Sequence, residues 1–416
     1  MDERERKKIP YDAAPITREY NVPMQGKNDK KLQIGSLPAF VIAILVVFNI
    51  ILGAVLINFV NKPQNNNVVN LTYNVSPTET SEVVVAASKA KLSAVVIGVG
   101  GSNSSGVAYS STNVPTYNQL LSTDSRGAGV IIGLNKAAGE AYILTCDHVV
   151  YRAPNAVFVC LYDSYTPMYA TVIGESNKND IALLKVKSDI IKTASCTAAS
   201  VANSAYVTEG DTAIAVGNPQ SNGFSVTSGV VSRLNTMVSA SYGSYSIKIS
   251  TIQVDTAINS GNSGGGLFDG NGNLIGIVES KTNSASIDNV AYAVPINRAM
   301  SIALNFIDGR HEAYAKAGYS VAISGSTINE HEGKILRIPT IVVTSVQSGS
   351  DAANAGIEVG DRLVSFSYNN KTVEFTSEYS YEDEKYSINI GDTVSYKIIR
   401  NGSEITINVV VTELYS

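Results

Sequence analysis

The sequence contains no tryptophan, only three histidines and only three cysteines among its 416 residues. Cys146, Cys160 and Cys196 are too few for a disulfide scaffold and odd in number, so we expect buried or free thiols. The formal net charge of −5 leaves no positive field for phosphate backbones, which argues against a nucleic-acid partner. No cluster of ligating side chains has metal-site spacing, so neither a metal nor an organic cofactor is expected.

A long stretch near the N-terminus lacks charge altogether. No charged residue occurs from Leu32 to Asn61, and the apolar core Leu37–Val60 comprises 24 residues. As a helix rising about 1.5 Å per residue it would cover about 36 Å, enough to cross a bilayer core. It is longer than the apolar part of a signal peptide, which favours an uncleaved anchor. Eight Lys and Arg residues precede it within residues 1–31, so the positive-inside rule places the N-terminus in the cytoplasm.

Beyond this segment, short apolar runs separated by Gly, Asn, Ser and Asp dominate the chain. Residues 61–82 are polar with two prolines and are predicted to form a linker, and residues 83–96 a short helix capped by Thr80 or Ser81. From about residue 93 to 300 the pattern is typical of an all-β barrel or sandwich, with a surface loop at 101–126. The clearest predicted strands are 129–133, 142–145, 181–186, 212–216 and 274–278.

A second β-rich unit is predicted from about Tyr319 to the C-terminus. It includes a strand at Pro339–Val346 and a short helix at 350–356. Residues 393–400 and 404–411 are predicted to pair as a hairpin, because Asn-Gly between two apolar runs is a strong hairpin signal. A helix at 305–318 is expected to join the two units.

The first β unit contains one histidine that could serve as a general base. A serine is a weak nucleophile unless a base takes its proton, and that base needs an orienting partner. His148 directly follows the predicted strand 142–145, whereas His311 falls in the connecting helix and His331 in a polar loop. The shortage of histidine therefore makes His148 the candidate base.

The best candidate for the orienting acid is Asp180. It opens the apolar run 180–184, where a carboxylate at the mouth of a buried strand could hold an imidazole in one tautomer. Asp163, in a polar turn, and Asp147, adjacent to the histidine and directed elsewhere by strand alternation, are its competitors.

The candidate nucleophile is Ser263, in the segment Gly261-Asn262-Ser263-Gly264-Gly265. The glycines permit a tight backbone that could aim the N–H groups of Gly261 and Ser263 at a developing oxyanion. One such donor contributes roughly 2.7–4 kcal/mol of transition-state stabilisation. A plain glycine-rich loop is the alternative, but the order His, Asp, Ser on a β-rich body is the chymotrypsin order and favours a protease.

The segments around these residues closely resemble the HtrA/DegP family of serine proteases, and the resemblance extends over residues 83–416. Proline is usual in the family where Ser260 and Gly266 stand, and both replacements would loosen the loop. The resemblance is carried by Leu144-Thr145-Cys146-Asp147-His148-Val149-Val150, Asn179-Asp180-Ile181-Ala182-Leu183-Leu184-Lys185-Val186, Ala215-Val216-Gly217-Asn218-Pro219 and Gln253-Val254-Asp255-Thr256-Ala257-Ile258-Asn259 with Gly261-Asn262-Ser263-Gly264-Gly265.

The resemblance implies a mainly β protein, with a chymotrypsin-like double β-barrel followed by a PDZ domain. We accordingly expect a cytoplasmic tail at 1–36, a transmembrane helix at 37–60, a linker at 61–82, the protease domain at 83–308 and the PDZ domain at 309–416. It also implies a homotrimer or larger homo-oligomer, lying outside the membrane, that cuts unfolded or misfolded polypeptides.

Two substrate sites follow from the same resemblance. The residue six positions before the nucleophile, Ala257, would form the base of the S1 pocket, with Ile258 and Ala293 beside it. Without a carboxylate there, small or medium aliphatic side chains fit better than Arg or Lys, with discrimination of about 1–3 kcal/mol per methylene. The PDZ domain would capture peptide carboxylates at a loop in which Ala322 replaces a usual glycine. That loop comprises Tyr319, Ser320, Val321, Ala322 and Ile323.

Two other functions are compatible with parts of this pattern. A non-catalytic chaperone or peptide-binding scaffold could use the same folds, although it would not need all three residues of a triad. A dedicated signalling protease that cuts one membrane partner would need the same residues as a quality-control protease.

Overall fold

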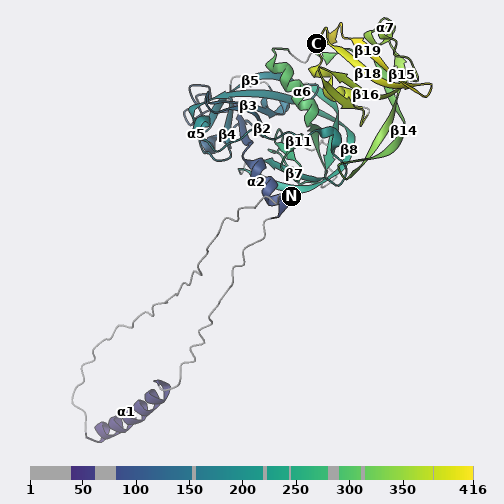
Figure 1. Ribbon diagram of the computed structural model, residues 1–416. Coiled ribbons are helices and arrows are strands. Elements are labelled where there is room, and N and C mark those ends of the chain that lie inside the picture. Colours follow the sequence, from purple (N-terminus) through teal and green to yellow (C-terminus); the bar gives the residue numbers. More distant parts are fainter. Residues whose placement is uncertain are drawn as a thin grey trace, which may run out of the picture. The chain divides into compact units, whose positions relative to one another are not determined.

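The computed structural model describes residues 39–60, 81–151, 156–218, 223–242, 245–279, 290–310, 314–377 and 379–415 (Figure 1). The chain divides into two units, Met1–Pro77 and Thr78–Ser416. In the first unit the structure describes helix α1 (Ala39–Val60). Among the described residues no helix has both the length and the apolar character needed to cross a membrane, so the anchor predicted at 37–60 is unconfirmed. The predicted tail at 1–36 lies outside the described residues, as does nearly all of the linker.

The second unit begins with helix α2 (Glu82–Lys91), capped by the Ser81 side chain, and a closed β-barrel. The order of neighbouring strands around this first barrel is β1-β2-β3-β6-β5-β4. Every residue of β1 and β4 is buried, because closure turns one face of each strand inward while loops and helices cover the other. The elements of this part are β1 (Ala94–Val99), α3 (Tyr117–Leu120), β2 (Ser125–Asn135), β3 (Glu140–Thr145), α4 (Asp147–Val150), β4 (Val157–Leu161), β5 (Met168–Ser176), β6 (Ile181–Lys187) and α5 (Asp189–Thr193).

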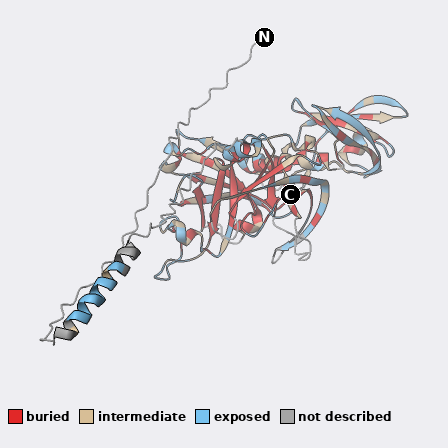
Figure 2. Cartoon of the chain, turned by 90° about the horizontal axis from the view of Figure 1, so that it is seen from below, coloured by how far each residue is buried: buried red, intermediate tan, exposed pale blue. Residues whose placement is uncertain are grey.

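A second closed barrel follows, with neighbouring strands in the order β10-β11-β12-β9-β8-β7. Figure 2 shows buried residues concentrated in the strands of the two barrels. One apolar core contains side chains of both, such as Leu144 from the first and Phe268 from the second. The elements are η1 (Ser204–Tyr206), β7 (Thr212–Gly217), β8 (Ser225–Tyr242), β9 (Tyr245–Val254), β10 (Gly266–Phe268), β11 (Leu274–Glu279), β12 (Ala291–Pro295) and α6 (Ile296–Ile307). The predicted double β-barrel is confirmed.

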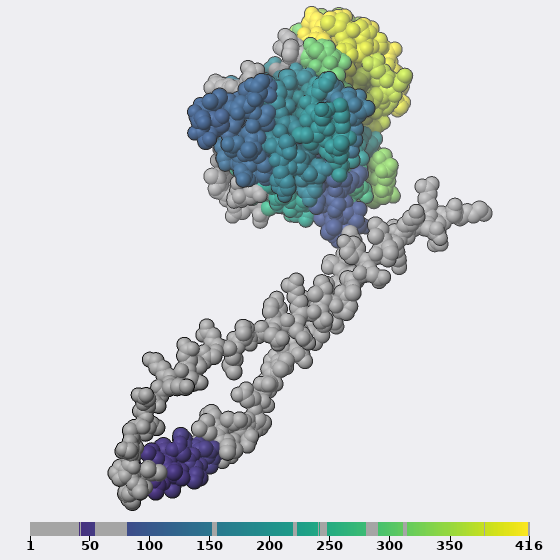
Figure 3. All heavy atoms as spheres, turned by 90° about the vertical axis from the view of Figure 1, so that its left-hand side faces the viewer, coloured from purple at the N-terminus to yellow at the C-terminus, as the bar shows by residue number. Residues whose placement is uncertain are grey.

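The C-terminal part is a separate antiparallel sheet with its own apolar core, in contact with the barrels (Figure 3). Its strand order is β14-β15-β16-β18-β19, so β14 is an edge strand. A sixth strand of this sheet, β17, pairs with β16, and β13 and β20 form a separate two-stranded sheet. The elements are β13 (Tyr314–Ala315), β14 (Tyr319–His331), β15 (Lys334–Val346), α7 (Asp351–Ala355), β16 (Arg362–Tyr368), β17 (Lys371–Glu374), α8 (Ser380–Glu384), η3 (Lys385–Ser387), β18 (Thr393–Arg400), β19 (Ser403–Val410) and β20 (Leu414–Tyr415).

Several local predictions need correction. The helix predicted at 83–96 ends at Lys91, and residues 94–96 belong to β1. The connecting helix predicted at 305–318 is instead α6, which ends at Ile307. Within the predicted surface loop at 101–126, Leu120 is fully buried. The five residues predicted as a peptide-binding loop, Tyr319, Ser320, Val321, Ala322 and Ile323, form the first part of edge strand β14.

Candidate active site

His148 and Asp180 are brought together by the pairing of β3 with β6, which places Thr145 opposite Ala182. His148 lies in the helical turn α4 just after β3, and Asp180 immediately precedes β6. The Nδ1 atom of His148 lies 2.7 Å from Oδ2 of Asp180, and the backbone N–H of His148 donates to Oδ1 at 2.9 Å. Both carboxylate oxygens thus bind one residue, which fixes the ring as well as its backbone.

Asp180 adopts an uncommon backbone conformation, with a φ of 53°. Aspartate and asparagine enter this left-handed region more readily than other residues with a Cβ. The Asp180 side chain is fully buried, while that of His148 is 15% exposed. The carboxylate is therefore shielded from water, and the imidazole retains an accessible edge.

The charge state of His148 depends on several acids. Burial by itself lowers the pKa of His148, but the charge and hydrogen bond of Asp180 outweigh it, with Glu279 and Asp147 adding to the effect. The net result is a raised pKa. A carboxylate on Nδ1 also favours the tautomer in which Nδ1 carries the proton, which leaves Nε2 able to accept one.

The loop of Ser263 lies against the same corner of the first barrel. Ser263 is 4% exposed, and its carbonyl accepts from the N–H of Ala128 in β2 at 2.9 Å. Gly264 has a φ of 81°, and a Cβ on it would lie 2.1 Å from Thr145 Oγ1 and 2.9 Å from Cys146 N. The structure therefore places the backbone after Ser263 next to the segment that carries His148.

Two backbone donors remain available in this loop. The N–H groups of Asn262, Gly264 and Gly265 donate to the carbonyls of Asn259, Val278 and Asn262, respectively. Within the described residues, no acceptor is recorded for the N–H groups of Gly261 and Ser263. Gly261 has a φ of 97°, which a residue with a side chain would rarely adopt. These are the two donors predicted for an oxyanion.

Gly266, predicted to loosen the loop, instead begins strand β10, where it pairs with Val216 of β7 and Ile277 of β11. A Cβ at this position would lie 2.4 Å from the ring of Phe268. The glycine is therefore required by close packing, and it belongs to the barrel rather than to the loop. Ser260 is exposed.

Three buried polar side chains near the site were not singled out from the sequence. Within the described part of the chain, Nδ2 of Asn218 and Oδ1 of Asn262 have no hydrogen-bond partner, and Glu279 is fully buried. Asn218 is nonetheless tied to the loop, because its N–H donates to the carbonyl of Gly261 at 3.3 Å. Asn218 and Asn262 stand in the family-like segments, but Glu279 lies at the end of an otherwise apolar strand and carried no such signal.

The other aspartates and histidines considered for the site have different positions or contacts. Asp163 accepts from the N–H of Ser195 at 2.6 Å. Asp147 is buried, but it begins the helical turn α4 and does not follow the strand alternation used to set it aside. His331 ends β14 and stacks on Tyr206 with ring centroids 4.0 Å apart, whereas His311 lies outside the described residues.

The predicted S1 residues have different environments. Ala257 is exposed, and its carbonyl accepts from Thr227 Oγ1 at 2.9 Å. Ile258 and Ala293 are both buried in the apolar core of the second barrel. Ile258 and Ala293 therefore lie in one buried cluster, whereas Ala257 is accessible to solvent.

Metal ligation at this site is disfavoured by the state of Cys146. Atoms of Cys146, His148 and Asp180 that could bind a cation lie within 4.8 Å of one another. Burial, together with Asp180 and Glu279, raises the pKa of Cys146 well above its ordinary value, and its Sγ donates to Val278 O at 3.3 Å. A thiol that keeps its proton is a poor metal ligand. All three cysteines are free and buried, as predicted.

Comparison with known proteins agrees with this geometry. Residues 127–277 match the trypsin-like peptidase domain, and residues 321–411 match the PDZ domain. The chain is 33% identical over 305 residues to the serine protease Do-like HtrA of Lactococcus lactis subsp. cremoris, covering 70% of this chain and 72% of that protein. It is 31% identical over 289 residues to the periplasmic serine endoprotease DegP of Salmonella typhimurium, covering 68% of this chain and 56% of that protein.

A solved structure has a similar fold. The HtrA-type protease AlgW with tripeptide has a TM-score of 0.51 and 25% sequence identity, covering 82% of this chain and 98% of that one. The double barrel, the adjoining PDZ match and the extent of the Lactococcus similarity lead to one conclusion. The chain belongs to the HtrA family of serine endopeptidases.

Proposed function

We propose that Ser263 is the nucleophile of this endopeptidase, His148 its general base and Asp180 the group that orients the base. The observation that carries the proposal is the double contact of Asp180 with the ring and backbone N–H of His148. In this assignment Nε2 of His148 takes the proton of the Ser263 hydroxyl as its oxygen attacks the scissile carbonyl. The protonated imidazole then donates its proton to the leaving amine as the C–N bond breaks, and the acyl group stays on Ser263. Water, activated by the same imidazole, hydrolyses this acyl-enzyme and restores the free serine.

The N–H groups of Gly261 and Ser263 would stabilise the tetrahedral intermediate. This role is supported because, within the described residues, these two N–H groups have no acceptor in the protein. The N–H groups of Asn262, Gly264 and Gly265 in the same loop each donate to a backbone carbonyl. Such donors are effective because they are already oriented when negative charge develops on the oxygen.

The substrates we propose are unfolded or damaged proteins outside the cytoplasm. Ala257 offers no charge to a basic side chain, so Ala257 with Ile258 and Ala293 would favour small or medium aliphatic residues at the cleavage site. The name of the Salmonella relative, a periplasmic endoprotease, supports the location. A library of peptides that differ only in the residue before the cleaved bond tests the pocket, and faster cleavage after Arg or Lys would contradict it.

The PDZ domain is proposed to bind peptide C-termini along β14. Because β14 is an edge strand, its outer N–H and C=O groups can pair with an added strand, which is how PDZ domains hold peptides. Tyr319 to Ile323 would lie beside the peptide end. Fluorescence anisotropy with a labelled peptide and its C-terminally amidated form tests this, since equal affinity would exclude carboxylate capture.

We further propose the predicted domain limits, 83–308 and 309–416, a homotrimeric or larger assembly, and an anchor at 37–60. The anchor is supported by a run of exposed apolar side chains in α1, such as Phe48 and Ile50, in a helix without charge. Release of the full chain from membranes by alkaline carbonate would count against the anchor. The anchor would leave the barrels outside and residues 1–36 in the cytoplasm.

The decisive experiment replaces Ser263 by alanine in the full chain. The purified protein should release peptides from casein, and Ser263→Ala should release none above background while keeping its thermal unfolding temperature. Ser122→Ala, at an exposed serine between α3 and β2 of the first barrel, is the control for a serine replacement away from the site. Equal casein cleavage by the wild type and Ser263→Ala would overturn the assignment and favour the scaffold function.

A further inference from the structure

One hydrogen bond connects the PDZ domain to the residue that precedes Asp180. Nδ2 of Asn179 donates to the hydroxyl of Tyr386 at 2.6 Å and to Oγ of Ser176 at 3.0 Å. Asn179 lies between β5 and β6 of the first barrel, and Tyr386 lies in η3 of the C-terminal part. Their exposed fractions are only 6% and 4%. The contact is therefore buried and lies within the interface between two domains.

The position of this bond matters because of the backbone beside it. Asp180 has a φ of 53°, a conformation that costs energy and persists only where neighbouring contacts hold it. Asn179 is the residue immediately before Asp180. The hydrogen bonds of its side chain therefore help to hold the backbone from which Asp180 extends. A change there would tilt the carboxylate that binds both the ring and the N–H of His148.

The hydroxyl of Tyr386 is itself held by the interface. Asp383 precedes Tyr386 in the chain, and its Oδ1 accepts hydrogen bonds from Arg298 of α6, from Nε at 2.9 Å and from Nη2 at 2.5 Å. Arg298 also donates from Nη1 to the carbonyl of Ser250 in β9 at 3.2 Å. Lys385 Nζ lies 4.0 Å from the ring centre of Tyr314. The segment that contains Tyr386 is thus fixed to the second barrel, so its hydroxyl reaches Asn179 from a defined place.

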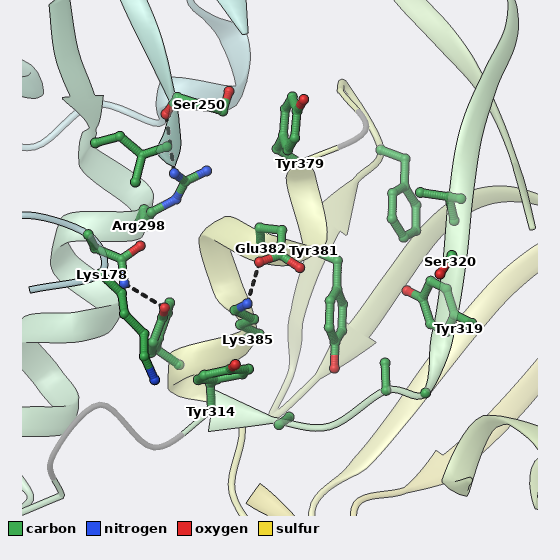
Figure 4. A pocket seen from close by; sticks show the side chains of 18 of the residues that line it. Lys178, Ser250, Arg298, Tyr314, Tyr319, Ser320, Tyr379, Tyr381, Glu382 and Lys385 are labelled. Carbon is green, nitrogen blue, oxygen red and sulfur yellow. Dashed lines mark hydrogen bonds and ion pairs between the residues drawn. The ribbon is translucent and has the colours of Figure 1, made fainter. Parts of the chain in front are cut away.

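The same two residues line a cavity between the domains. Its volume is about 830 Å³, and its walls include Asn179 and Tyr386 together with Tyr319, Ser320 and Val321 of β14. Figure 4 shows Lys178 and Arg298 from the barrels and Tyr319, Tyr381 and Lys385 from the C-terminal part around this space. The beginning of the proposed peptide-binding strand and the residue next to the triad acid therefore border one cavity.

We propose that Asn179 and Tyr386 are a positioning pair for Asp180, through which the PDZ domain helps to hold the acid of the triad in its working orientation. The proposal rests on the assignment of Asp180 to that triad. Neither residue touches the substrate or the reacting atoms. Their effect should therefore appear in the rate of the chemical step and in the proton affinity of His148, rather than in substrate binding.

The first test removes one hydroxyl. In the full chain, Tyr386→Phe keeps the buried ring and should lower kcat on a peptide substrate about three- to tenfold, the range expected for one lost hydrogen bond, with KM unchanged. Tyr396→Phe removes a hydroxyl from a tyrosine in the buried core of the C-terminal sheet, which makes no bond to Asn179, and should leave kcat unchanged. An equal fall in both variants, or a Tyr386→Phe variant with normal kcat, would overturn the proposal.

The pH profile separates positioning from a general loss of stability. Among the described residues, four groups lie around His148: Asp180 before β6, Glu279 of β11, Asp147 of α4 and the thiol of Cys146. Only the contact with Asp180 should weaken in Tyr386→Phe, so the acid limb of kcat/KM should move to lower pH. A merely destabilised protein would lose amplitude with the limb unmoved, and that outcome would contradict the pair.

A second variant approaches from the other side of the bond. Asn179→Ala should lower kcat at least as much as Tyr386→Phe, and the double variant should be no slower than Asn179→Ala because both remove one interaction. Multiplicative effects would show that the two residues act independently and would overturn the pair. Failure of the assignment of Asp180 is recognised separately, since Asp180→Asn would then retain nearly full activity.

Discussion

The Asp180 carboxylate and the loop around Ser263 differ in how completely their polar groups are bound. In the first barrel both oxygens of Asp180 bind His148. In the second barrel the loop around Ser263 has two free backbone donors, and the described structure records no partner for Asn218 Nδ2 or Asn262 Oδ1. His148 and Asp180 therefore hold each other in place, whereas the loop around Ser263 retains hydrogen-bonding capacity that a ligand or another loop conformation could use.

The size of this difference can be estimated. A buried polar group that lacks a partner costs about 1–3 kcal/mol, so a partner for Asn218 Nδ2 or Asn262 Oδ1 would stabilise the loop. A rearrangement of only a few residues that satisfies both atoms would recover this energy. The first barrel offers no comparable gain at Asp180, which is why we expect activation to occur on the side of Ser263.

The largest effect should come from breaking the contact of Asp180 with His148. Asp180→Asn keeps the shape of the side chain but favours the wrong tautomer of His148, so kcat should fall by about 10⁴, as in serine proteases of this geometry. Initial rates on a chromogenic peptide measure the effect. Asp163→Asn, at an acid that binds Ser195 instead, is the control and should retain activity; a small loss in Asp180→Asn would mean that the ring is held by other groups.

The next effect concerns the contact between the loop around Ser263 and the segment that carries His148. Gly264→Ala would place a methyl group 2.1 Å from Thr145 Oγ1 and 2.4 Å from the carbonyl of Ala128, at a φ of 81°. The loop must then move, and we expect a loss of at least about 100-fold in kcat/KM with destabilisation of roughly 3 kcal/mol.

Gly106→Ala is the matched control, because Gly106 has a φ of 77° with no atom within 4 Å of the new Cβ. It isolates the backbone strain, about 1 kcal/mol, from the collision. Thermal unfolding and peptide cleavage are measured together. If Gly264→Ala behaves like Gly106→Ala, the loop is looser than the packing indicates.

The smallest effect concerns the pKa of His148, which the neighbouring acids raise. A general base must be neutral, so the raised pKa of His148 should place the acid limb of kcat/KM above the roughly 6.5 of an ordinary histidine. Glu279→Gln removes one of the acids that raise this pKa, so the limb should move to lower pH by a fraction of a unit. A move to higher pH would show that Glu279 acts on His148 mainly by some other route.

Much of the fold could be predicted because its signals are local. The strand predicted at 181–186 and the hairpin at 393–411 agree with β6, β18 and β19, since apolar runs and Asn-Gly turns act over a few residues. Elimination among three histidines selects His148, and the position before a buried strand selects Asp180; the structure shows that these two residues are in contact. The geometry then needed only the pairing of β3 with β6.

Other features depend on contacts that no local pattern records. The segment Tyr319–Ile323 is predicted as a loop because the resemblance to PDZ domains places the peptide-binding loop there, yet pairing with β15 makes it the first part of a strand. Helix α6 was placed too late, although buried residues such as Ala299, Ile302 and Phe306 recur at helical spacing. The bond between Asn179 and Tyr386 joins positions 207 apart, and only the folded chain brings them together.

The tip of the β14–β15 hairpin contacts the segment around Tyr206 and Asp211, and this contact can be followed by NMR. Lys334 at this tip binds Asp211 at 2.6 Å, and His331 stacks on Tyr206 with an interplanar angle of 12°. Protons held above the face of an aromatic ring resonate upfield, so the imidazole signals of His331 should return towards random-coil positions whenever the tip separates from the barrel. In a chain with three histidines, His148 and His331 become two resolvable NMR probes, one for the catalytic centre and one for the seam between the domains.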